Sequence, residues 1–239
     1  MKSFGEYLNE IKISLEYHDK LNPRIWKNDK LKPEVRKKLL AFIAAWREFA
    51  NIPENLVQDI VLTGGNANFN YTPMSDLDVH LIVDRSKLGK DRTMVDDYLK
   101  DKKVLWTLTH DITILGYPLE PYAQDPSETF HAGQGAYSLQ NDEWIQKPEH
   151  GEYNFKKDKG LRKKVQFYMD MIDDLITNKS DLDTFDVVKS KITTMRGAAI
   201  QKAGEFSFEN LVFKELRNKG YLDKMTNYVK NYKDKDLSL

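Results

Sequence analysis

Two short apolar runs in the first half of the chain are joined by a glycine pair and a polar loop. The first run is DIVLT at residues 59–63, and Gly64 and Gly65 follow it directly. Ten further residues lead to Asp-Leu-Asp at 76–78, which continues into the apolar stretch VHLIV. Short apolar runs rich in β-branched residues and bounded by glycine predict β-strands. We therefore expect two strands, at 59–63 and 77–84, in a mixed α+β domain.

The second strand begins with two carboxylates. Residues i and i+2 of a strand point to the same face, so Asp76 and Asp78 should project together. Two adjacent carboxylates repel each other, and burying them beside an apolar strand is costly unless something compensates. A divalent cation is one compensation, because Mg²⁺ binds one or two carboxylates together with substrate phosphates. The alternative is a solvated strand end at which Asp76 caps a turn.

The glycine pair adds a second feature of the same kind of site. Glycine lets the backbone approach a ligand closely, and backbone N–H groups in such turns bind phosphate oxygens. A glycine pair alone is more often a tight turn. The fixed order of strand, Gly64-Gly65, ten residues ending in Ser75, and Asp-Leu-Asp is far more specific than any of its parts.

In this order the segments VLTGG, NANFNYTPMS and DLDVHLIVD resemble the motif of the DNA polymerase beta superfamily of nucleotidyltransferases. The resemblance implies a palm with a small mixed sheet flanked by helices, in which Asp76 and Asp78 hold two Mg²⁺ or Mn²⁺ ions. It also implies a third carboxylate on a later strand. Glu120 in YPLEPYAQ is our choice, and Asp111 is the alternative. Pro121 predicts that this strand lies at an edge or is bulged, because proline cannot donate a ladder hydrogen bond.

The implied reaction is transfer of a nucleoside monophosphate from a nucleoside triphosphate to a hydroxyl group, with release of pyrophosphate. The acceptor is left open between a protein, an RNA end and a nucleotide. Gly64, Gly65 and Ser75 are expected to contact the phosphates. Lys214 and Arg217 are expected to join them, since they are three residues apart and share one face of a predicted helix. A solvated helix face is the alternative for these two.

Two narrower resemblances point to bacteriophage proteins. HDITILGYPLEPYAQD followed by GAYSLQNDEWIQKP looks like uncharacterised phage-encoded nucleotidyltransferases. MKSFGEYLNE at residues 1–10 resembles the capsid-targeting segments of internal head proteins of T-even-type phages. These resemblances imply a location in the cytoplasm of an infected bacterium or packaging in the virion. They also keep a second hypothesis open, a non-catalytic nucleotide-binding or structural virion protein on the same scaffold.

Composition narrows the classes of site and partner. The 239 residues include no cysteine, which excludes disulfides and thiolate metal sites and leaves carboxylate, histidine or carbonyl ligands. No apolar stretch approaches the roughly 20 residues needed to cross a bilayer. Met1-Lys2 precedes a polar stretch, so no secretory signal is expected. The formal net charge is zero, which argues against stable binding to long DNA because that usually needs a basic stripe.

The remaining pattern predicts how the chain is divided. We expect an N-terminal segment at 1–32, a nucleotidyltransferase palm at 33–125, a loop or linker at 126–157 and a C-terminal helical domain at 158–239. Within the palm, apolar periodicity predicts helices at 33–50 and 93–106. Two further strands are expected at 111–123, joined near Gly116.

Three other residues have two interpretations each. His80 is expected to be a hydrogen-bonded strand histidine, with a metal role as the alternative. Tyr137 and Ser138 lie in the predicted loop, where they could stack on a base or contact phosphate, or could simply pack.

Overall fold

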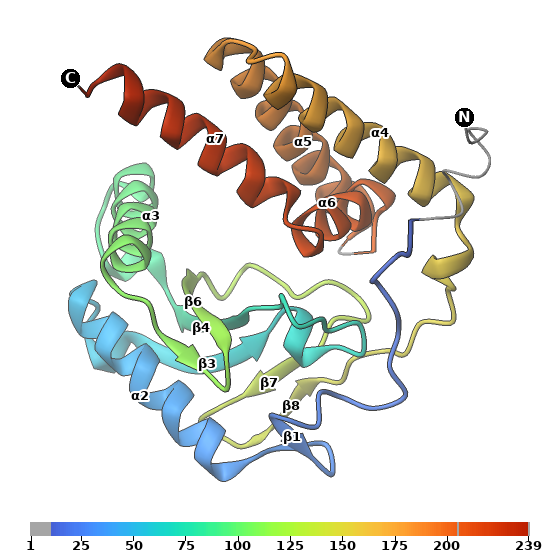
Figure 1. Cartoon of the computed structure of the whole chain (residues 1–239). Helices are drawn as coiled ribbons and strands as arrows, with labels where there is room; N and C mark the ends of the chain where they lie inside the picture. The colour runs from blue at the N-terminus through green and yellow to red at the C-terminus, as the bar shows by residue number, and fades with distance from the viewer. Residues whose placement is uncertain (1–10, 205, 239) are drawn as a thin grey trace. The chain divides into compact units, whose positions relative to one another are not determined.

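A computed structural model describes residues 11–204 and 206–238 of the chain. The segment 1–10, which resembles a capsid-targeting peptide, lies outside the described residues. The described residues form a mixed α+β fold with six α-helices, a mixed six-stranded sheet and a small antiparallel sheet (Figure 1). The chain divides into two compact units. We call Tyr17–Glu152 the sheet unit, and the described residues of Met1–Glu16 and Tyr153–Leu239 the helical unit.

The six-stranded sheet has the strand order β5-β6-β4-β3-β7-β8. The strands are β3 (Val57–Thr63), β4 (Leu77–Val83), β5 (Thr113–Ile114), β6 (Tyr117–Gln124), β7 (Ala136–Ser138) and β8 (Glu143–Gln146). Strands β4 and β6 pair in parallel, and the other neighbours are antiparallel. The crossover between the parallel strands contains helix α3 (Arg92–Thr109), since parallel strands need a long connection.

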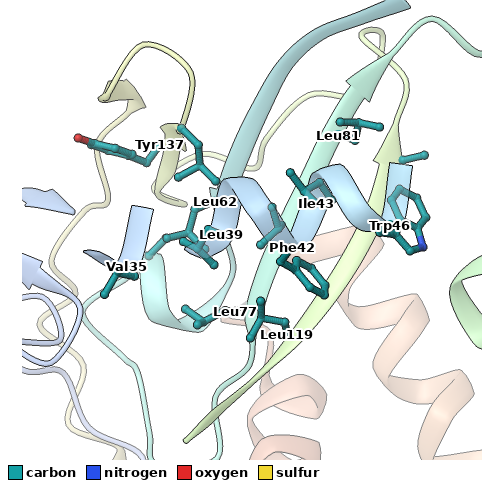
Figure 2. Packing of buried hydrophobic residues seen from close by; sticks show 14 of the residues in the cluster. Val35, Leu39, Phe42, Ile43, Trp46, Leu62, Leu77, Leu81, Leu119 and Tyr137 are labelled. Carbon is teal, nitrogen blue, oxygen red and sulfur yellow. The ribbon is translucent and has the colours of Figure 1, made fainter. Parts of the chain in front are cut away.

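Helix α2 (Pro33–Phe49) packs against one face of this sheet. Pro33 lies in its first turn. Its buried residues recur at helical spacing and form a single apolar face, made of Val35, Leu39, Phe42, Ile43 and Trp46. Figure 2 shows this face in the same cluster as Leu62 of β3, Leu77 of β4 and Leu119 of β6. The predicted helix and both predicted strands are therefore confirmed, with shifts of one or two residues at their ends.

Buried and half-buried residues alternate along β4, and this alternation separates an apolar face of the strand from a polar one. Every second residue from Leu77 to Val83 is buried, and the residues between them are half-buried. Asp78 and His80 therefore lie on the face opposite to the apolar core that α2 covers. Glu120 and Tyr122 are the half-buried residues in the same alternation on β6. The sheet thus has one dry face and one face with polar, partly accessible groups.

The predicted boundaries of the palm differ from the observed unit. Residues 126–157, expected to be a loop or linker, contain β7 and β8, and the sheet unit continues to Glu152. Strand β7 has only three residues, too few for a visible period of two. The expected N-terminal segment 1–32 also contributes to this unit, through β1 (Trp26–Lys27) and β2 (Lys30–Leu31). Trp144 of β8 stacks on Trp26, with ring centroids 4.8 Å apart.

Pro121 is accommodated by the short neighbouring strand. Strand β5 pairs only with Tyr117 and Pro118 of β6. The backbone N–H of Leu119 still donates to the carbonyl of Ile112 at 3.2 Å. From Glu120 onward β6 pairs with β4 alone, so at Pro121 it has an unpaired side. The predicted edge character of this strand is confirmed at the proline, although β6 is not the last strand of the sheet.

The helical unit contains α4 (Lys159–Thr177), α5 (Leu182–Ala203), α6 (Phe208–Asn218) and α7 (Tyr221–Asp236). Ser207 is the N-cap residue of α6, and Gly220, at φ 75°, separates α6 from α7. The buried carboxylate of Glu215 on α6 accepts hydrogen bonds from the backbone N–H of Ser14, at 2.9 and 3.0 Å, and from its hydroxyl, at 2.8 Å. In the part of the chain that the structure describes, no helix is both long and apolar enough to cross a membrane.

Candidate functional site

The three carboxylates predicted to act together lie together. Asp76 directly precedes β4, and Asp78 is the register partner of Glu120 across the parallel β4–β6 pair. One carboxylate oxygen from each of the three residues lies within 4.8 Å of the other two. All three side chains are half-buried. We call Asp76, Asp78 and Glu120 the acidic triad. The alternative third carboxylate, Asp111, is exposed, precedes β5 and is outside this triad.

The glycine pair lies against the triad. Gly64 has a φ of 77°, in the left-handed region that favours glycine. A Cβ at Gly64 would lie 1.8 Å from Asp78 Oδ2, and a Cβ at Gly65 would lie 2.8 Å from Ser75 Oγ. Only glycine therefore fits at position 64 without displacing the Asp78 carboxylate. The backbone of the turn adjoins the carboxylate directly.

Two buried asparagines fix the loop between the glycines and the aspartates. The Asn66 amide donates to the backbone carbonyls of Ser75, at 3.2 Å, and Asp76, at 2.9 Å. The Asn68 amide donates to the carbonyl of Gly64 at 2.6 Å. Both side chains are almost fully buried. The sequence reading missed them, and the repeated asparagine in NANFN was the available signal, because asparagine side chains often satisfy loop backbone groups.

Ser75 takes part in the same loop network. It is buried, and its Oγ accepts a hydrogen bond from the backbone N–H of Thr72 at 2.9 Å. Its observed contacts hold the loop in shape. Its predicted contact with phosphate stays a prediction.

Lys103 on α3 is the charged neighbour that the sequence reading did not single out. Its Nζ donates to Glu120 Oε2 at 2.9 Å. The same ammonium lies 6.0 Å from the ring centroid of Tyr122, the next residue on this face of β6. The acidic triad therefore has a cationic side chain beside one of its carboxylates.

His80, Tyr137 and Ser138 have structural partners. His80 Nδ1 donates to Gln124 Oε1 at 2.6 Å, and burial lowers the pKa of His80 to about 4, so the ring is neutral at pH 7. Tyr137 is fully buried between Trp26 and Trp144, and its hydroxyl donates to Asp142 at 2.8 Å. Ser138 Oγ donates to Asp59 Oδ1 at 2.8 Å. The hydrogen-bonded interpretation of His80 and the packed interpretation of Tyr137 are confirmed.

The two basic residues predicted to contact the phosphates belong to the helical unit. Lys214 and Arg217 both lie on α6 and are half-buried. Their role toward a nucleotide stays a prediction.

The three carboxylates could hold a hard cation. Three carboxylates with oxygens this close are the ligands that Mg²⁺ and Mn²⁺ prefer, and no thiolate is present in the chain. No protein-family model matches the chain, and the searches of curated proteins and of solved structures found no significant similarity. The residues of the site are therefore the basis for assigning a function.

Proposed function

We propose that the protein is a divalent-metal-dependent nucleotidyltransferase, which transfers a nucleoside monophosphate from a nucleoside triphosphate to a hydroxyl acceptor. The observation that carries this proposal is the convergence of the acidic triad within 4.8 Å, beside a glycine turn with no room for a side chain at position 64. The order of these parts along the chain is the one that resembles the polymerase beta superfamily.

Asp76, Asp78 and Glu120 would hold two Mg²⁺ or Mn²⁺ ions. When bound, such ions supply Lewis-acid activation of the acceptor hydroxyl and neutralise charge on the phosphates. The sheet positions two members of the triad, because Asp78 and Glu120 are register partners on parallel strands. Asp76 is positioned by the Asn66 amide, which donates a hydrogen bond to its backbone carbonyl. Preorganised ligands of this kind reduce the reorganisation needed during reaction.

The glycine turn supplies the second half of the proposed site. At Gly64 and Gly65 the space of a side chain is taken by Asp78 and Ser75, so the backbone of the turn lies directly against the carboxylate. Backbone N–H groups of such turns bind phosphate oxygens. Asn68 holds the carbonyl of Gly64, so the turn keeps its position relative to the triad. Catalysis would then consist mainly of positioning and charge neutralisation.

One observation favours the non-catalytic alternative. Glu120, the third carboxylate, already has a cationic partner in Lys103 at 2.9 Å. A site in which this ion pair persists would bind nucleotide with only two aspartates available for a metal. A nucleotide-binding or structural role, including one in a virion, would follow from that arrangement.

Release of pyrophosphate tests the proposal directly. The full chain is incubated with Mg²⁺, each nucleoside triphosphate and hydroxyl acceptors that include the protein itself and RNA ends. We expect Asp76→Asn and Asp78→Asn to lower turnover by about 100-fold or more, as loss of a transition-state contact does. Asp111→Asn is the matched control, because this carboxylate lies outside the triad. Full turnover in both triad variants would refute the assignment.

Calorimetry with a non-hydrolysable nucleotide separates the two candidate functions. Binding that requires Mg²⁺ supports the enzyme. Equal binding in Mg²⁺ and in a chelator, with no pyrophosphate released on any acceptor, supports the non-catalytic protein.

A further inference from the structure

The ammonium group of Lys103 lies next to one carboxylate of the acidic triad. Its Nζ is 2.9 Å from Glu120 Oε2, and the two side chains are 32% and 40% exposed. The triad oxygens lie within 4.8 Å of one another, so the ammonium adjoins the whole acidic group through Glu120. The ion pair is only partly hydrated, which limits how strongly solvent screens it.

The adjacent lysine shows that this placement belongs to one residue and is not a general property of the helix. Lys102 directs its ammonium over the rings of Phe49, at 4.8 Å, and Tyr98, at 5.4 Å. Neighbouring residues of an α-helix point about 100° apart, because the helix has 3.6 residues per turn. Lys102 and Lys103 therefore carry the same charge on the same helix toward different surroundings.

We infer that Lys103 is an internal counter-ion that competes with the divalent cation for Glu120. Three close carboxylates repel one another, and an ammonium beside one of them relieves part of that repulsion. A dication bound to the triad would be repelled by the same ammonium. Filling the site therefore requires the Lys103–Glu120 contact to weaken or break, and Lys103 raises the metal concentration at which the site fills. The inference rests on the proposed function only for the position of the cation.

Binding of Mn²⁺ alone tests this inference without any turnover. The full-length protein is titrated with Mn²⁺ at fixed ionic strength, and bound ion is measured by electron paramagnetic resonance and calorimetry. Lys103→Met removes the charge and keeps the apolar stem, so we expect the Mn²⁺ dissociation constant to fall about tenfold. Lys103→Arg keeps the charge, and we expect its dissociation constant to stay within about threefold of the native value. Lys102→Met is the matched control and should bind as the native protein does.

The variants distinguish failure of the inference from failure of the site. If Asp78→Asn loses Mn²⁺ binding while Lys103→Met binds no tighter than the native protein, the acidic triad stands and the counter-ion role of Lys103 is wrong. If Lys102→Met tightens Mn²⁺ binding as much as Lys103→Met, the tighter binding comes from the change in net charge and not from the position of Lys103, and the inference is also wrong. If the native protein binds no Mn²⁺, or Asp78→Asn binds it unchanged, the proposed metal site falls and the inference with it. Lys103→Gln serves as a second neutral variant if Lys103→Met does not fold.

Discussion

Gly64 and Asp78 occupy adjoining space, such that a Cβ on the glycine would lie 1.8 Å from Oδ2 of the aspartate. Gly64 directly follows β3, and in the antiparallel β3–β4 pair Thr63 is the register partner of Asp78. The glycine turn and the Asp78 carboxylate therefore form one geometric unit. A side chain at position 64 must move the carboxylate, the turn or both.

Gly64→Ala should destabilise the protein and impair the site together. The positive φ costs about 1 kcal/mol for alanine, and the contact with Asp78 should raise the total loss to roughly 2–4 kcal/mol. Gly116→Ala is the matched control, since Gly116 has φ +84° and a Cβ there meets no described atom within 4 Å. Urea unfolding of both variants measures the difference. Equal losses would show that backbone conformation alone, and not the Asp78 contact, determines the cost.

Divalent cations should stabilise the native protein against heat. A ligand at 100 times its dissociation constant adds about 2.7 kcal/mol to the free energy of unfolding when it binds only the folded state. We expect the melting temperature to rise with Mg²⁺ or Mn²⁺ in the native protein and in Asp111→Asn, but not in Asp78→Asn. A rise of the same size in Asp78→Asn would place the cation elsewhere.

Arg85 should contribute far more to stability than Arg92. The Arg85 side chain is 10% exposed; its guanidinium pairs with Asp96 at 3.1 Å and Glu128 at 2.9 Å, and donates to the carbonyl of Ala123. Arg85→Met removes the cation beside two partly exposed carboxylates and the donor to the buried carbonyl of Ala123, which should cost about 1–3 kcal/mol. The Arg92 side chain is 61% exposed, and Arg92→Met should cost less than about 1 kcal/mol. Chemical denaturation measures the free energy of unfolding of both variants. Similar losses would show that the burial of Arg85 does not make its ion pairs more stabilising than those of Arg92.

His80 should make the folded state sensitive to mild acid. Burial lowers the pKa of His80 from 6.5 to about 4 in the folded protein, so the unfolded chain takes up the proton first. The contribution of neutral His80 to the free energy of unfolding is therefore fully present above about pH 6.5. It is lost as the pH falls toward 4, by as much as about 3 kcal/mol. Unfolding in a chelator between pH 4 and 7 measures this slope. The slope should flatten in His80→Gln, and an unchanged slope would assign it to other groups.

The sequence predicted the parts of the fold that depend on local pattern. The α2 face repeats every three or four residues over 17 residues, and β3 combines β-branched residues with a glycine pair directly after its end. The carboxylates of Asp76 and Asp78 follow from the period of two along a strand. Their meeting with Glu120 came from a resemblance, because the pairing of β4 with β6 joins residues about forty positions apart.

Long-range partners account for what the sequence reading missed. Strand β7 is held by pairing with β3 and by the packing of Tyr137 against Trp26, neither of which leaves a local period. Lys103 is one of two adjacent lysines on α3, and only the position of β6 decides which of them reaches Glu120. Asn66 and Asn68 look like ordinary loop residues until their buried carbonyl partners are known.

The parallel pairing of β4 with β6 also has a consequence for the order of folding. Every group of the acidic site, from Gly64 to Glu120, belongs to one uninterrupted stretch that contains β4, α3 and β6. Closing this stretch requires only the β3–β4 loop and the α3 crossover, and none of the later pairings of β7 and β8. Short loops close at lower entropic cost than long ones. The chain segments that bring the carboxylates together therefore all lie within residues 64–120. Electrostatic repulsion among the carboxylates opposes the closing of this stretch, and Lys103 on α3, within the same stretch, reduces that repulsion.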